Sequence, residues 1–266
     1  ETTGGAFSMG DSVTFTGSGE TDWGHAFTVV YELDGGTYDD MYMTYDMGDS
    51  GKITFGGSSK AGSGINSISE IVPSAEDDAY DYTGDATAYG VVGGSTGTDN
   101  IGYDVTFGDF AVSLENEKIA NGSDRSIGLK WTGVDGLTVV AGMEEYDTAD
   151  ANGGSEGDTV GIKYATGGFT FGYQISNVDN LGSGEVDYDG THMGATFAIN
   201  DNMSVGYNRQ KADISNKDND EVNSAITASY TSGSMTVKGY AAKTEDVAGS
   251  ATNDDEGKGV GVSFSF

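Results

Sequence analysis

The 266-residue sequence has no cysteine, a single proline and few basic residues. Without cysteine the fold has neither disulfide bonds nor thiol chemistry. Only 12 Lys and Arg stand against 43 Asp and Glu, which gives a formal net charge of −31. This excess of carboxylates argues against nucleic acid as a partner, because phosphates need basic residues to neutralise them.

Long apolar runs are also missing. No segment approaches the roughly 18 apolar residues of a membrane-spanning helix. No basic and then apolar leader opens the sequence, as expected of a mature exported form or of a chain made without a leader. A membrane β-barrel remains compatible with the lack of a long apolar run, since only every second residue of each strand faces lipid.

What the sequence has in quantity is glycine, with 44 residues, and aromatic residues, at 11% of the chain. Apolar and polar residues alternate along most of it, as Val13 and Phe15 do among hydroxyl residues. Period two indicates β-strands, whose successive side chains point to opposite faces. The predicted strands lie near 10–19, 23–34, 38–47, 50–58, 99–107, 109–118, 124–132, 136–146, 157–165, 168–177, 186–199, 201–211, 221–231, 234–243 and 256–266. Residues 2–9 are a candidate for a short sixteenth strand.

Connections between these strands alternate between short turns and longer acidic loops. Short turns include 108–109 and 166–168, and longer loops include 118–124, 146–158 and 212–221. Alternation of this kind is typical of a membrane barrel, with short turns on the periplasmic side and long loops outside. We therefore predict an all-β, 16-stranded antiparallel transmembrane β-barrel in one domain, residues 1–266.

The two faces of the predicted strands differ in chemistry. Alternate residues of each strand point to the same face, and we call the two sets outward and inward parity. Aromatic residues of outward parity cluster beside the short turns, as in the girdle at a membrane interface. Ordinary core aromatics of a β-sandwich are the alternative. The predicted girdle is Phe107, Phe110, Trp131, Tyr164, Phe169, Phe197, Tyr230, Phe264 and Phe266. Charged residues of inward parity are tolerable only if that face lines water. The predicted lumen wall includes Glu32, Lys52, Asp104, Glu115, Lys130, Glu144, Lys163 and Lys238.

One connection, residues 59–98, is too long to be an ordinary turn, and loops of this length are usually functional. At this point the chain resembles the general porins of Gram-negative bacteria, especially the α-proteobacterial, Rhodobacter-like type. The resemblance is carried by Ser18–Gly24, by Met41–Tyr45 leading to Gly51–Gly56, by the long loop that follows directly, and by the C-terminal Val260–Phe266.

The resemblance implies a homotrimer and a long loop that folds into the barrel and constricts it. In that family, loop carboxylates face basic residues across the lumen. The residues that match the acidic side are Glu70, Glu76, Asp77, Asp78, Asp81 and Asp85. The basic side departs from the pattern, because Arg125 and Arg209 have outward parity and only four lysines have inward parity.

We therefore expect an outer-membrane porin that lets small hydrophilic solutes and ions diffuse passively, with a preference for cations. No cofactor is required. Calcium is a candidate ligand of the acidic outer loops, at Asp254, Asp255 and Glu256, because hard oxygen ligands suit this ion. Outer-membrane lipid and lipopolysaccharide are the expected surroundings.

Two other classes remain open. An outer-membrane enzyme would need a Ser, His and acid constellation, and His25 and His192 are the only histidines. Neither lies in a catalytic motif, so we expect no enzyme. A secreted acidic β-protein of the adhesin or surface-layer type would share the glycine and the charge. It would not require the turn-side aromatics or the terminal Phe.

Overall fold

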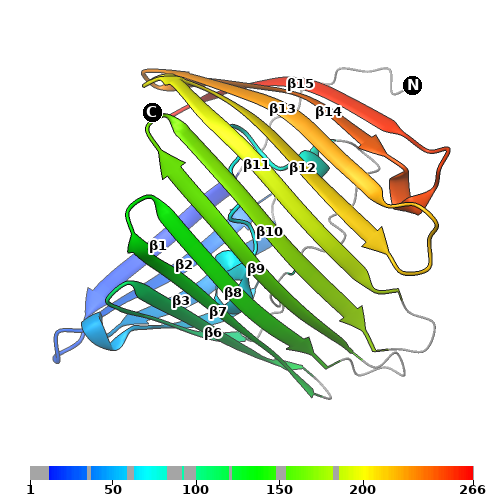
Figure 1. Cartoon of the computed structure of the whole chain (residues 1–266). Helices are drawn as coiled ribbons and strands as arrows, with labels where there is room; N and C mark the ends of the chain where they lie inside the picture. The colour runs from blue at the N-terminus through cyan, green and yellow to red at the C-terminus, as the bar shows by residue number, and fades with distance from the viewer. Residues whose placement is uncertain are drawn as a thin grey trace.

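The computed structural model describes residues 12–34, 37–58, 63–82, 92, 100–119, 122–147, 154–181 and 186–265. These residues form one antiparallel sheet of 15 strands, in which each strand pairs with the next along the chain (Figure 1). No helix among them is both long and apolar enough to cross a membrane. The all-β class and the succession of predicted strands are confirmed.

The strands match the predicted segments closely. They are β1 (Ser12–Glu20), β2 (Ala26–Asp34), β3 (Thr37–Asp46), β4 (Lys52–Ser58), β5 (Asn100–Phe107), β6 (Phe110–Ile119), β7 (Gly122–Val134), β8 (Leu137–Tyr146), β9 (Ser155–Thr166), β10 (Phe169–Asn180), β11 (Tyr188–Asn200), β12 (Met203–Ile214), β13 (Glu221–Ser232), β14 (Met235–Glu245) and β15 (Asp255–Phe264). Short 3-10 helices are η1 (Gly48–Ser50), η2 (Gly64–Ile68), η3 (Ala79–Asp81) and η4 (Val247–Gly249).

Tight turns close the hairpins at one end of the sheet. Phe107 pairs with Phe110 across the two-residue turn between β5 and β6. Gly108 has a φ of +60° there, and Gly233 has the same φ between β13 and β14. Positive φ costs glycine little, because it has no Cβ. We call this end of the sheet the turn side, and the opposite end the loop side.

The sheet curls, so that it has a convex and a concave face (Figure 1). Large apolar side chains of the predicted outward parity lie exposed on the convex face, as Phe15 (58%), Val160 (51%) and Ile226 (64%) do. Soluble monomers rarely expose an apolar surface that runs across so many strands. The concave face instead carries polar side chains and glycine, and residues 63–82 of the connection between β4 and β5 lie against it.

The predicted count of sixteen strands stays a prediction. Among the described residues the sheet is open, with β1 and β15 as its edges. The candidate for the sixteenth strand, 2–9, lies outside the described residues. Two connections are shorter than predicted: β6 and β7 pair as far as Ile119 and Gly122, and β12 continues to Ile214. Pairing continues there because it satisfies the backbone N–H and C=O groups.

Candidate functional site: a loop seated on the concave face

The long connection between β4 and β5 is described over residues 63–82 and at Val92. We call residues 63–82 the inner loop. It begins beside β5 and runs across the strands, with η2 against β6, β7 and β8 and η3 against β12, β13 and β14. The loop thus crosses the concave face transversely to the strands (Figure 1).

Glycines of the strands form the seat of this loop. A Cβ added at Gly194 would lie 2.6 Å from the carbonyl oxygen of Pro73, and one at Gly206 would lie 2.9 Å from the backbone nitrogen of Ala75. Real Cβ atoms do not approach so closely, so only glycine permits the contact. The glycines that contact the inner loop in this way are Gly102, Gly128, Gly142, Gly161, Gly172, Gly194, Gly206 and Gly257.

Side chains between the glycines hold the loop backbone by hydrogen bonds. Gln174, which is 1% exposed, accepts a bond from the Ile71 N–H (3.2 Å) and donates one to the Ile68 carbonyl (3.1 Å). The Gly64 N–H donates to Ser113 Oγ (2.7 Å) and the Ala75 N–H donates to Thr227 Oγ1 (3.2 Å). The loop therefore replaces water as the partner of these buried wall groups.

Apolar contacts fix the loop near both of its ends. Ile65, Ile68 and Ile71 pack with Val92 and with Val140 of β8 in one buried cluster.

At the other end, Tyr82 is buried with Ala225 and Ala242, and its ring stacks on Tyr240 with centroids 4.1 Å apart. These buried contacts add to the hydrogen bonds in opposing displacement of the loop.

Carboxylates gather on the loop, as the resemblance implies. Tyr80 donates to Glu70 and to Asp78 Oδ2 (3.3 Å), which draws these acids together. Burial raises the pKa of Asp78 to about 7, and the charges of Glu70 and Asp81 contribute to the same shift. Burial and the charge of Asp77 raise the pKa of Asp81 to about 6.

The loop acids that the structure describes are Glu70, Glu76, Asp77, Asp78 and Asp81, which we call the loop carboxylates. Asp85 lies outside the described residues. On the wall, Asn208 Nδ2 donates to the Asp77 carbonyl (3.1 Å) and to Asp78 Oδ1 (3.3 Å). No described residue between 63 and 82 is basic.

Four lysines project from the concave face, and we call Lys52, Lys130, Lys163 and Lys238 the turn-side lysines. Lys52 lies 3.8 Å from Asp104 Oδ2, and Lys238 lies 3.8 Å from Glu76 Oε1 of the inner loop. Lys52, Lys130 and Asp104 line a hollow of about 450 Å³ beside η2. Lys52, Lys130 and Lys238 thus lie close to the inner loop.

The predicted wall acids have different surroundings. Glu115 is 5% exposed and accepts a bond from Asn100 Nδ2 (3.0 Å), and Glu144 is 7% exposed and accepts one from the Tyr146 hydroxyl (3.0 Å). Glu32 is half-buried on β2. Two of the acids expected to line open water are therefore covered in the structure.

Of the predicted girdle, Phe107 (57%), Phe110 (41%), Tyr164 (44%), Phe169 (47%), Tyr230 (43%) and Phe264 (63%) are exposed. Trp131 and Phe197 are half-buried, and Phe266 lies outside the described residues. Phe169 stacks on Phe197 at 4.4 Å. These rings lie at the turn-side ends of their strands, and their role as a girdle at the membrane interface stays a prediction.

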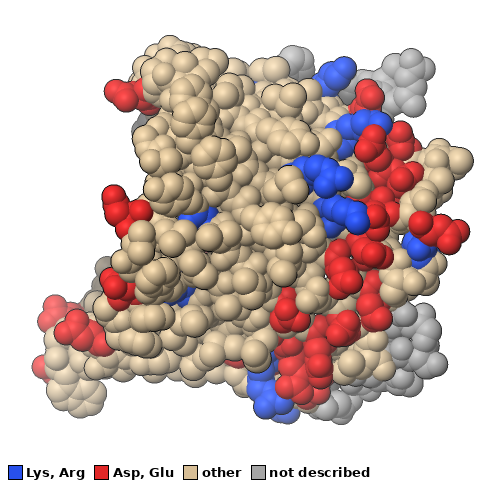
Figure 2. All heavy atoms as spheres, in the orientation of Figure 1, with Lys and Arg blue, Asp and Glu red and all other residues tan. Residues whose placement is uncertain are grey.

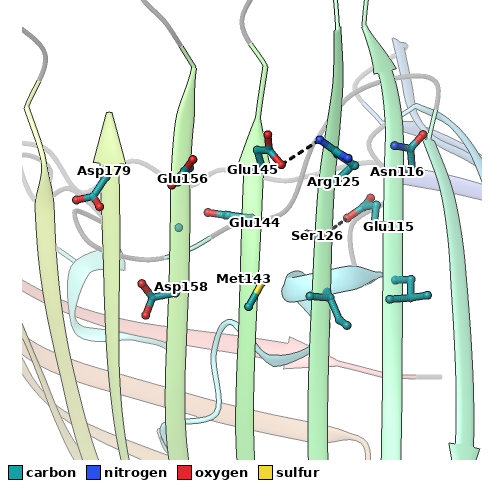
Figure 3. A pocket seen from close by; sticks show the side chains of 13 residues that line it. Glu115, Asn116, Arg125, Ser126, Met143, Glu144, Glu145, Glu156, Asp158 and Asp179 are labelled. Carbon is teal, nitrogen blue, oxygen red and sulfur yellow. Dashed lines mark hydrogen bonds and ion pairs between the residues drawn. The ribbon is translucent and has the colours of Figure 1, made fainter. Parts of the chain in front are cut away.

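Acids on the convex face gather at the loop side of the sheet, beyond the apolar surface (Figure 2). Arg125 pairs with Glu145 at 3.0 Å there, beside Glu156, Asp158 and Asp179 (Figure 3). These side chains line a hollow of about 580 Å³, together with Leu114, Ile127 and Met143. The transition from apolar to charged residues marks one edge of the apolar band.

The residues considered for metal binding or catalysis have other partners. Asp254 accepts the Asp246 N–H (3.2 Å) and pairs with Lys243 (3.3 Å), while Asp255 accepts the Glu256 N–H (2.8 Å). Within the described ranges, no group of three metal-ligating side chains comes together, so the structure gives calcium no support at Asp254, Asp255 and Glu256.

The two histidines lie in different parts of the sheet, since His25 directly precedes β2 and His192 is in β11. His25 Nδ1 lies 2.6 Å from the Tyr45 hydroxyl, and the His192 ring meets Tyr80 edge to face at 6.4 Å.

The comparisons with known proteins agree with this geometry. A family model described as Gram-negative porin matches residues 1–237. This chain belongs to the Gram-negative porin family. The porin is therefore a protein of the outer membrane, and the secreted, surface-layer alternative is set aside.

Solved structures share the porin fold at low identity. A porin refined at 1.8 Å is 19% identical, with a TM-score of 0.73 over 96% of this chain and 92% of that chain. An anion-selective porin from Comamonas acidovorans is 14% identical, with a TM-score of 0.70 over 96% and 89%. A triple mutant of the Rhodopseudomonas blastica porin is 15% identical, with a TM-score of 0.67 over 97% and 90%. No curated protein sequence matches significantly.

The glycine seat was missed by the sequence analysis, although a signal was present. Gly128, Gly161 and Gly172 share parity with Lys130, Lys163 and Gln174, so each falls within a strand on the polar face. Glycine inside a strand often marks close approach of another backbone segment. Its recurrence on consecutive strands could have indicated the path of the inner loop.

Proposed function

We propose that this porin forms a water-filled channel for passive diffusion of small hydrophilic solutes and ions, and that the inner loop sets its aperture. The observation that carries the proposal is the glycine seat. A chain segment held across the concave face by glycines, buried hydrogen bonds and two apolar clusters occupies space that solutes would otherwise use. Closure of the barrel by a sixteenth strand from 2–9 is part of the proposal, as is a single domain over 1–266.

We further propose that the channel prefers cations. The loop carboxylates lie at the constriction, and the part of the inner loop that is described contains no base to offset them. Selectivity follows the sign of the charges at the narrowest level of a pore. The fold alone does not decide this sign, since one porin of similar fold is anion-selective.

Reversal potentials in planar bilayers under a KCl gradient test the preference. The unmodified porin is expected to show a reversal potential of the sign for cations. The double variant Asp77→Asn with Asp81→Asn is expected to reduce it, because two of the five loop carboxylates lose their charge. Asp218→Asn, in the connection between β12 and β13, is the control. Anion preference of the unmodified porin would contradict the proposal.

The assembly proposed is a homotrimer in the outer membrane, in contact with lipid and lipopolysaccharide. The resemblance to general porins supports the trimer, and the exposed convex face supports the contact with lipid. Stepwise closure of single insertions in groups of three would show channel and oligomer together. Closure in single steps of full conductance would contradict the trimer.

A further inference from the structure

The concave face of β13 is covered at four consecutive inward positions. Each of these side chains is at most 2% exposed, and in order toward the loop side they are Thr227, Ala225, Asn223 and Glu221. The inner loop covers the first two, since the Ala75 N–H donates to Thr227 Oγ1 and Tyr82 packs with Ala225. The last two lie nearer the loop side, beyond the contact with Tyr82.

Asn223 links the strands on either side of it through buried hydrogen bonds. Its Nδ2 donates to Gln210 Oε1 of β12 (2.9 Å) and to Glu221 Oε1 (3.0 Å). Its Oδ1 accepts from Thr244 Oγ1 of β14 (2.6 Å). A buried carboxylate needs polar partners in place of the water that it loses, so this network holds the Glu221 side chain in a fixed position.

The contact that covers Glu221 comes from the connection between β14 and β15, residues 246–254, which we call the outer connection. Glu221 Oε2 accepts the Ala248 N–H of η4 (2.8 Å). Val247 is 6% exposed, and η4 contacts β12 and β13. Glu221 lies an even number of residues from Thr227, which bonds the inner loop, so both side chains point to the concave face. A segment bonded to Glu221 therefore lies over that face.

The backbone of the outer connection is strained at η4. Among the described residues, the non-glycine residues with positive φ are Asp246 and Ala248, both at +53°. The left-handed region is unfavourable for alanine, because its Cβ approaches the following carbonyl oxygen. Such strain persists only where the surrounding contacts fix the conformation, and it is found at functional segments. The bond from Ala248 to Glu221 is one of the contacts that offset it.

From these contacts we infer that the outer connection is a second constricting segment of the channel, and that Glu221 is the positioning residue that seats it. The inference rests on the proposed channel. The inner loop covers β13 at Thr227 and Ala225, and the outer connection covers the same strand two inward steps nearer the loop side. Release of η4 from Glu221 would widen the mouth of the channel over β12 and β13. The porin should therefore have a lower conductance level with η4 seated and a higher level with η4 released.

Single-channel recording in planar bilayers tests the inference, because two substitutions act on the seated state in opposite directions. Ala248→Gly keeps the N–H and removes the strain of positive φ. The share of time in the higher level is expected to fall about threefold, since the strain relieved exceeds the freedom that glycine adds to the released state. Glu221→Ala removes the acceptor, and the share is expected to rise about tenfold or more.

Two further variants separate seating from general destabilisation. Glu221→Gln keeps one acceptor oxygen and is expected to lie between Glu221→Ala and the unmodified porin. Glu256→Ala, at an exposed glutamate on the convex face of β15, is the matched control and should leave both levels unchanged. Hydrogen exchange of the amide at residue 248 measures the same equilibrium and should change in the same direction as the current in each variant.

The outcomes distinguish the inference from the proposed function. Absence of any channel would overturn the proposed function. A channel whose levels and exchange rates are the same in Ala248→Gly, Glu221→Ala and the unmodified porin would overturn the second constriction alone. So would faster exchange in Glu221→Ala without a rise in conductance. If Glu221→Ala fails to fold, Ala248→Gly still decides, because it leaves the hydrogen bonds of Glu221 in place.

Discussion

The two faces of this sheet come from the same strands, yet they differ in which side chains are exposed and which are buried. On the convex face, Ile162 and Tyr173 are exposed although they are apolar. On the concave face of the same strands, Thr159 and Gln174 are 1% exposed although they are polar. A soluble protein would show the reverse. The difference indicates hydrocarbon outside the sheet and a polar interior that is partly filled by the inner loop.

The comparison also shows how burial is achieved without a conventional core. The concave face buries its polar side chains by bonding them to loop backbone, as Gln174 does with Ile68 and Ile71. Among the residues that the structure describes, the convex face has no such partner, as expected of a surface that contacts lipid. The same kind of substitution should therefore have a different effect on each of the two faces.

The largest effect is expected from a charge on the convex face. Ile162→Lys places an ammonium in the apolar band and should destabilise the folded porin by about 2–4 kcal/mol in a bilayer. Denaturant titration in lipid vesicles measures this. Thr170→Lys, on the concave face of the neighbouring strand, is the matched control and should cost much less. Equal losses would show that the two faces do not meet different solvents.

A side chain in the glycine seat should have the next largest effect. Gly172→Val would bring methyl groups against Pro73 and force the inner loop away from the wall. Overpacking of this kind costs about 1–3 kcal/mol. Single-channel conductance should fall, since the displaced loop enters the lumen. Gly261→Val, at a concave site with no atom within 4 Å of the added Cβ, is the control. Unchanged conductance of the Gly172→Val variant would show that the inner loop does not rest against Gly172.

Loss of the Gln174 amide should loosen the loop without unfolding the sheet. Gln174→Ala leaves the Ile71 N–H and the Ile68 carbonyl without this partner, at a local cost of about 1–3 kcal/mol. Hydrogen exchange of amides in the inner loop should accelerate. Asn177→Ala, on the same strand but bonded to Asp158 on the convex face, should leave that exchange unchanged. Retained protection in the first variant would show that other contacts suffice.

The smallest effect is expected from pH. The raised pKa values of Asp78, about 7, and of Asp81, about 6, mean that both carboxyls take up protons as pH falls from 8 to 5. The loop loses negative charge, so cation preference should weaken over this window. Reversal potentials recorded at several pH values measure the change. Asp78→Asn should remove the part near pH 7. A preference independent of pH would mean that these groups do not face the ion path.

Much of the fold was predictable because period two survives in nearly every strand. The predicted segment 109–118 became β6 (Phe110–Ile119), and 221–231 became β13 (Glu221–Ser232). The surroundings of the wall acids were not predictable. Parity placed Glu115 and Glu144 on the polar face, but it could not show that they are covered. Which segment covers a face depends on contacts between residues far apart in sequence.

The sequence by itself determined which side chains face lipid and which face inward, since alternation along a strand is a local property that each pair of residues repeats. It also determined the turns, because glycine adopts the positive φ they require. Only the tertiary structure decided the path of the inner loop, the glycines that seat it and the position of the lysines beside it. These depend on strand register and on curvature of the sheet, which bring Pro73 against Gly172 and Gly194 across a separation of about a hundred residues.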